Sequence, residues 1–72
     1  MNKLLKAYKF TEIEQYYDMI WVSIVNGQNP QAKKQFLAMP KLNRKEFVIS
    51  FHEIWSFSSE YKWCTTFFIE LI

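Results

Sequence analysis

The sequence predicts an α+β fold in which two N-terminal helices, at about 12–25 and 30–38, pack on a C-terminal β-hairpin with strands at about 47–57 and 61–71. Apolar residues bounded by capping signals recur at helical spacing in the N-terminal half. Residues 47–72 alternate with a period of two, are rich in aromatic and β-branched residues, and contain no Ala, Gln or Arg, as is typical of strands. A small all-α helical bundle is the alternative fold.

The helical signals are clearest between Thr11 and Gly27, after a helical or irregular lead-in at 2–10. Thr11 and Glu14 have the spacing of a capping box, in which each side chain accepts a hydrogen bond from the other residue's backbone amide. Asn26-Gly27 predicts the end of the helix, because glycine adopts the left-handed conformation without strain. The apolar face consists of Ile13, Tyr16, Tyr17, Ile20 and Ile24.

The second helix is predicted from two prolines. Asn29 can cap a helix and Pro30 then takes the first helical position, where its missing amide has no intrahelical partner to lose. Pro40 ends the helix, because the residue before a proline avoids the α region. Phe36 and Leu37 would face the core.

The C-terminal segment has two interpretations. As a hairpin that turns at about 58–60, it has one almost wholly apolar side. The residues of that side are Phe47, Ile49, Phe51, Glu53, Trp55, Phe57, Tyr61, Trp63, Thr65, Phe67, Ile69 and Leu71. As a helix, it would begin with a capping box from Asn43 to Glu46, and a helical face would then gather Phe47, Val48, Phe51, Ile54 and Trp55. The many poor helix formers in this segment favour the hairpin over the helix. The lack of glycine in the proposed turn counts against the hairpin.

The composition indicates a surface that is used for binding. The 72 residues predict one small domain over 1–72, with 50% hydrophobic, 19% aromatic and 22% charged residues. A chain of this size has too little interior to bury that much apolar surface, so part of it is expected at an interface. The candidates are the back of the first helix and the last strand, and the predicted partner-binding residues are Met19, Trp21, Val22, Val25, Phe68 and Ile72.

The predicted function is therefore that of a small non-enzymatic regulator or inhibitor that binds another protein, and itself as a homodimer, through an apolar surface. Lys outnumbers Arg eight to one, and Phe, Tyr, Met, Ile, Asn and Lys far outweigh Gly, Ala, Arg and Pro, a bias typical of AT-rich coding DNA that suggests a phage or plasmid protein. A cytoplasmic location is expected, because lysines interrupt the N-terminal apolar residues and no apolar run reaches the roughly 20 residues of a membrane span. No cofactor or small-molecule substrate is expected.

The alternative function is that of a small nucleic-acid-binding regulator. No acid occurs between Asp18 and Glu46, and the basic residues Lys33, Lys34, Lys41, Arg44 and Lys45 fall in that interval. An enzyme is not expected: His52 is the only histidine and Cys64 the only cysteine, so nucleophilic catalysis would depend on that single pair across the two strands. The same count predicts no metal site within one chain.

Overall fold

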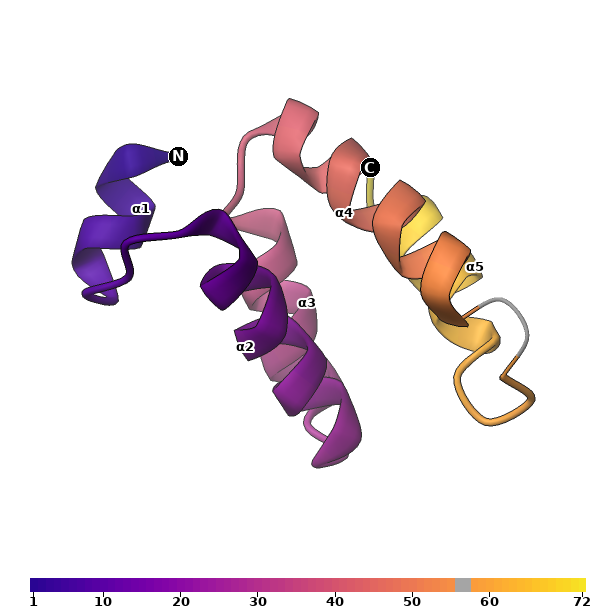
Figure 1. The fold of residues 1–72 in the computed structure, drawn as a ribbon. Helices are drawn as coiled ribbons and strands as arrows, with labels where there is room; N and C mark the ends of the chain where they lie inside the picture. Colours follow the sequence, from indigo (N-terminus) through magenta and orange to yellow (C-terminus); the bar gives the residue numbers. More distant parts are fainter. Residues whose placement is uncertain (56–57) are drawn as a thin grey trace. The chain divides into compact units, whose positions relative to one another are not determined.

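The structure of the chain is a computed structural model that describes residues 1–55 and 58–72, and these residues form α-helices and no strand. They fall into two compact parts, unit 1 at Met1–Met39 and unit 2 at Pro40–Ile72 (Figure 1). The fold class is thus all-α, and the predicted α+β fold is wrong. That 1–72 makes a single domain stays a prediction.

Unit 1 contains α1 (Asn2–Ala7), α2 (Ile13–Val25) and α3 (Asn29–Leu37). The helices predicted at about 12–25 and 30–38 are present as α2 and α3. Figure 1 shows these two helices side by side as an antiparallel hairpin, joined by a three-residue connection. Pro30 occupies the first turn of α3, as its missing amide allows.

Helix α2 is capped by different residues from those that the sequence predicted. The N-cap residue is Glu12, not Thr11, and the reciprocating side chain is Gln15, not Glu14. Gln15 Oε1 accepts hydrogen bonds from the backbone amides of Thr11 (2.7 Å) and Glu12 (2.9 Å). The amide of Gln15 has the same reach as a carboxylate, so the sequence offers two capping boxes one residue apart, and the structure uses the second.

Both α1 and α2 end in a Schellman motif. At the end of α2, Gln28 N donates to Ser23 O (2.8 Å) and Gly27 N donates to Ile24 O (3.0 Å), with Gly27 at φ +74°. At the end of α1, Phe10 N donates to Leu5 O (2.8 Å) and Lys9 takes the left-handed position at φ 60°. A lysine there carries the steric strain that glycine avoids.

These two helix ends predict opposite effects of exchanging glycine and a larger residue. Gly27→Ala should destabilise the protein by about 1 kcal/mol, because a Cβ at Gly27 meets no atom within 4 Å and only the backbone strain remains. Lys9→Gly should stabilise it by up to about 1 kcal/mol through relief of the same strain. Urea denaturation followed by circular dichroism measures both changes, and a shift of the same sign in both variants would contradict the assignment.

The interior of unit 1 is apolar apart from hydrogen bonds that connect α2 to Gln35 of α3. Tyr16 is fully buried, and its hydroxyl donates to the backbone carbonyl of Gln35 (2.6 Å). The Ser23 hydroxyl donates to Gln35 Oε1 (2.9 Å). Buried polar groups are retained when they are hydrogen-bonded, so these contacts fix the register of the hairpin. The buried apolar residues of unit 1 are Tyr16, Ile20, Ile24, Ala32, Phe36 and Met39.

Unit 2 consists of two helices where the hairpin was predicted. Residues 47–55 belong to α4 (Lys41–Trp55), and residues 63–69 belong to α5 (Trp63–Ile69). The two helices pack side by side and run antiparallel in Figure 1. The predicted turn at 58–60 does lie in the connection between them, and residues 56–57 of the predicted first strand lie outside the described residues.

The burial pattern of unit 2 explains why a helix forms. The buried residues of α4 are Phe47, Val48 and Phe51, at the i, i+1, i+4 spacing of a helical face. Ile49 would share the buried face of a strand with Phe47 and Phe51, yet it is 60% exposed. In α5, Cys64 and Phe68 are buried one turn apart.

Aromatic contacts hold α4 and α5 together. Phe68 lies against Phe47 (ring centroids 5.1 Å apart) and Phe51 (6.1 Å), in edge-to-face geometry. At the other end, Trp55 packs edge to face on Tyr61 (5.7 Å). Such pairs stabilise a core by about 0.5 to 1.5 kcal/mol beyond the burial of their area.

Candidate protein-binding surface

The predicted partner-binding residues of unit 1 lie on one helix. Val22 and Val25 of α2 are 53% and 50% exposed, and they are i, i+3 neighbours on the side of the helix opposite the buried Ile20. Met19 and Trp21 flank them and are half-buried. We call Met19, Trp21, Val22 and Val25 the α2 outer face.

The two predicted residues of unit 2 have different surroundings. Phe68 is fully buried between Phe47 and Phe51, so it belongs to the core of unit 2 and has no surface to offer a partner. Ile72 is 38% exposed at the end of the chain. The placement of Phe68 follows from the helix: residue 68 was assigned to the outer side of a strand, and the 3.6-residue period turns it inward.

The predicted basic residues are divided between the two units. Lys33 and Lys34 are exposed on α3, whereas Lys41 and Lys45 are exposed on the first two turns of α4. Arg44 is half-buried, and its Nε is enclosed without a hydrogen-bond partner among the described residues. The contiguous basic stretch in the sequence is therefore two groups of two exposed lysines on different helices.

The only pair that suggested nucleophilic catalysis does not form. His52 is exposed on α4, with Nδ1 lying 3.5 Å from the Thr65 hydroxyl. Cys64 is fully buried, and burial raises the pKa of its thiol from 9.0 to about 11. A thiol with that pKa is protonated at neutral pH, and a protonated thiol is a poor nucleophile.

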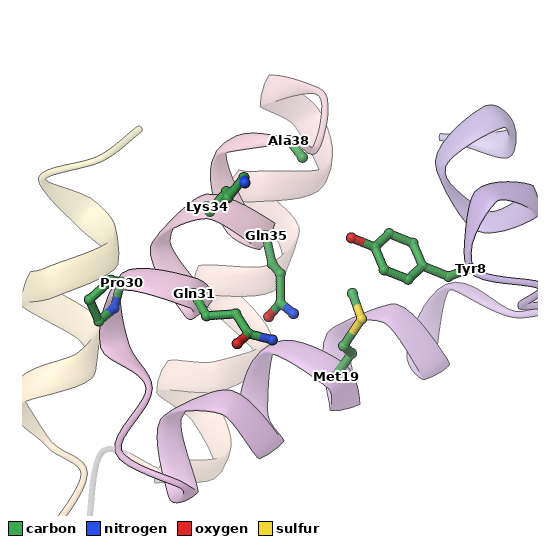
Figure 2. Close-up of a pocket in the computed structure, with 7 residues that line it drawn as sticks. All are labelled: Tyr8, Met19, Pro30, Gln31, Lys34, Gln35 and Ala38. Atoms are coloured by element: carbon green, nitrogen blue, oxygen red, sulfur yellow. The ribbon is translucent and has the colours of Figure 1, made fainter.

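A groove that the sequence did not predict lies in unit 1 beside the α2 outer face (Figure 2). It encloses about 650 Å³, and its lining residues come from the end of α1, from α2 and from α3 with its flanks. Met19 lines the groove and also belongs to the α2 outer face, so the two features are continuous. The lining residues are Tyr8, Met19, Pro30, Gln31, Lys34, Gln35 and Ala38.

Tyr8 forms the wall of this groove opposite α3. Its ring stacks on Phe10 (5.8 Å) and meets Tyr16 edge to face (5.6 Å), which anchors the end of α1 to α2. Figure 2 shows the Tyr8 hydroxyl and the side chains of Met19, Gln31 and Gln35 directed toward the same space. The sequence held one signal for this arrangement, an aromatic pair placed directly before a helix N-cap, but pattern alone cannot show where the lead-in folds back.

Unit 2 also exposes apolar side chains, and the hairpin interpretation had assigned two of them, Ile49 and Trp63, to its apolar side. Ile49 and Ile54 of α4 are 60% and 66% exposed, and Leu42 is 68% exposed. Trp63 of α5 is 43% exposed and packs edge to face on Phe67 (5.7 Å). The excess of apolar surface inferred from the composition is thus present in both units.

Comparisons with protein-family models, with curated proteins and with solved structures find no match for this chain. Across residues 1–55 and 58–72, no group of three or more His, Cys, Asp or Glu side chains is placed to hold a metal ion. No helix in the described part of the chain has both the length and the hydropathy that crossing a bilayer requires.

Proposed function

We propose that this chain is a small, non-enzymatic regulator or inhibitor that acts by binding another protein through the α2 outer face, and that the same face supports self-association. The observation that carries the proposal is the pair of half-exposed valines, Val22 and Val25, on the last turns of α2. Apolar residues that are clustered on one side of a helix, with a half-buried tryptophan at the margin, are the usual composition of a protein-binding surface.

The energetics favour a partner that covers this face. Completing the burial of a half-exposed valine contributes about 1 kcal/mol, so the two valines together supply about 2 kcal/mol. Glu14 and Asp18 precede them on the exposed side of the same helix, and Asp18 lies one turn before Val22. An apolar patch beside an acidic margin fits a helix or groove of a second protein.

The proposal of a binding protein is supported by the state of the reactive residues. Cys64 is enclosed in unit 2, whereas His52 is exposed with its Nδ1 3.5 Å from the Thr65 hydroxyl, and this separation favours a binding role over the nucleophilic pair. The alternative, nucleic-acid binding, would use Lys33 with Lys34 on α3 of unit 1 and Lys41 with Lys45 on α4 of unit 2. A cytoplasmic location and a phage or plasmid origin stay predictions.

Val22→Glu tests the proposal. Because Val22 is 53% exposed, the variant should keep the helical circular-dichroism spectrum of the wild type, while its self-association and its capture of a host protein should weaken at least about tenfold. Thr66→Glu, which places the same charge on an exposed position of α5, is the matched control and should bind like the wild type. Sedimentation velocity measures self-association, and pull-down from host lysate with nuclease and a high-salt wash measures capture.

The opposite results are equally informative. Equal association of Val22→Glu and the wild type would exclude the α2 outer face as the binding surface. Material that is released by nuclease or by high salt would instead favour the exposed lysines and nucleic acid. Loss of the helical spectrum in Val22→Glu would show that Val22 is part of the core.

A further inference from the structure

The groove in unit 1 contains hydrogen-bond donors and a cation but no carboxylate. Tyr8, Gln31, Lys34 and Gln35 supply its polar groups, and its apolar lining comes from Met19, Pro30 and Ala38. Its volume of about 650 Å³ is enough for two or three amino-acid side chains. A ligand that fits must combine an apolar part with a hydrogen-bond acceptor, and the lysine favours an acceptor with a negative charge.

Gln35 contributes a hydrogen-bond donor to the groove. The residue is only 7% exposed, its backbone carbonyl accepts from Tyr16, and its Oε1 accepts from Ser23. No described residue accepts a hydrogen bond from its Nε2, and the side chain lies at the groove. Gln35 Nε2 is not among the enclosed side-chain atoms that lack a partner, so this donor is accessible from the groove and can serve an acceptor that enters it.

The charge of the two units agrees with an acidic ligand. Unit 1 contains five lysines and three acidic residues, whereas unit 2 contains four basic and four acidic residues. The whole formal net charge of +2 therefore belongs to the unit that contains the groove. An approaching carboxylate gains from this charge as well as from Lys34.

We propose that this groove binds an acidic segment of the protein partner, with one Asp or Glu carboxylate held by Gln35 Nε2 and Lys34 and an adjacent aliphatic side chain placed on Met19 and Ala38. The inference rests on the proposed function, because Met19 connects the groove to the α2 outer face. It deepens that function by naming the chemistry of the partner: an acidic residue next to an aliphatic one.

A peptide pair tests the inference without knowledge of the partner. The probe is the blocked tripeptide acetyl-Leu-Asp-Leu-amide, and its control is acetyl-Leu-Asn-Leu-amide, which has the same shape without the charge. In the full chain, the Asp peptide should shift the NMR signals of the Met19 methyl group and the Gln35 side-chain amide. The Asn peptide should bind at least about fivefold more weakly, as expected on removing a charged partner from such hydrogen bonds.

Two substitutions assign the contacts. Gln35→Glu keeps an acceptor for Ser23 but replaces the donor by a carboxylate, so it should abolish binding of the Asp peptide. Lys34→Gln, at an exposed position that leaves the fold intact, should weaken the peptide about tenfold, whereas Lys33→Gln on the same helix outside the groove should not. The substitution at Lys34 keeps the test valid if Gln35→Glu fails to fold.

Three results would overturn the inference: no shift at Met19 and Gln35, equal binding of the Asp and Asn peptides, or equal weakening by Lys33→Gln and Lys34→Gln. The last would show that only the general charge of unit 1 attracts the peptide. Failure here is distinguishable from failure of the proposed function, because Val22→Glu tests the α2 outer face without touching the groove. If Val22→Glu weakens association and the peptides do not bind, the partner uses the α2 outer face alone.

Discussion

Replacing Phe68 by alanine should destabilise unit 2 by about 3 to 5 kcal/mol, the range for removing a fully buried phenylalanine. Phe68 is 0% exposed and packs edge to face on Phe47 and Phe51. Truncating its side chain therefore removes the central contact between α4 and α5. A core of this size supplies little more than about 3 to 5 kcal/mol in total, and unit 2 of the variant should therefore be largely unfolded at room temperature.

Fluorescence and circular dichroism measure this effect. Trp55 and Trp63 are in unit 2, so their emission should shift toward that of exposed tryptophan together with a loss of helical signal. Ile69→Ala is the matched control at the neighbouring position of α5: Ile69 is 54% exposed, and its truncation should change the stability by less than about 1 kcal/mol. Equal effects of the two substitutions would contradict the helical core of unit 2.

The protein should lose stability steeply as the pH rises above 9. Burial raises the pKa of the Cys64 thiol from 9.0 to about 11, and burial, with Tyr8 nearby, raises the pKa of the Tyr16 hydroxyl from 10.0 to about 12. In both cases the unfolded chain ionises at lower pH than the folded one, so the stabilisation is complete below the unfolded pKa and declines until the folded pKa is reached. The decline is about 1.4 kcal/mol per pH unit for each group.

The two residues act in different pH windows, which separates them experimentally. The free energy of unfolding should fall between pH 9 and 11 because of Cys64 and between pH 10 and 12 because of Tyr16, by about 2 to 3 kcal/mol for each residue. Urea denaturation at each pH from 8 to 11.5 gives the slope. In Cys64→Ala the decline should begin one pH unit later, and in Tyr16→Phe it should end earlier.

The comparison uses slopes and not absolute stabilities, because both substitutions also remove packing or a hydrogen bond. A wild-type profile that stays flat up to pH 11 would show that neither group is buried as described. An unchanged slope between pH 9 and 10 in Cys64→Ala would assign the loss of stability to groups other than this thiol.

Helices α2 and α3 could be predicted from the sequence because their signals are local. Gly27 ends α2 in the left-handed conformation, Pro30 begins α3, and the apolar residues between Ile13 and Ile24 recur at helical spacing only. The exposed valines of the α2 outer face were predicted for the same reason, since a helix with apolar residues on both sides must leave some of them outside.

Unit 2 and the groove were decided by tertiary structure. Between Phe47 and Leu71, 14 of the 25 positions are apolar or aromatic, and their spacing fits a period of 2 as well as a period of 3.6. The alternation and the strand propensity of these residues then favoured the wrong choice. Phe47 and Phe51 lie one turn apart on α4, and Phe68 of α5 packs against both of them. The groove likewise needs Tyr8 folded back on Tyr16, a contact between residues on different helices.

By itself the sequence determined the helices whose ends carry caps, glycine and proline, because those signals act within a few residues. Tertiary structure decided the fold class and which apolar side chains remain exposed, because burial depends on neighbours that are distant in the chain.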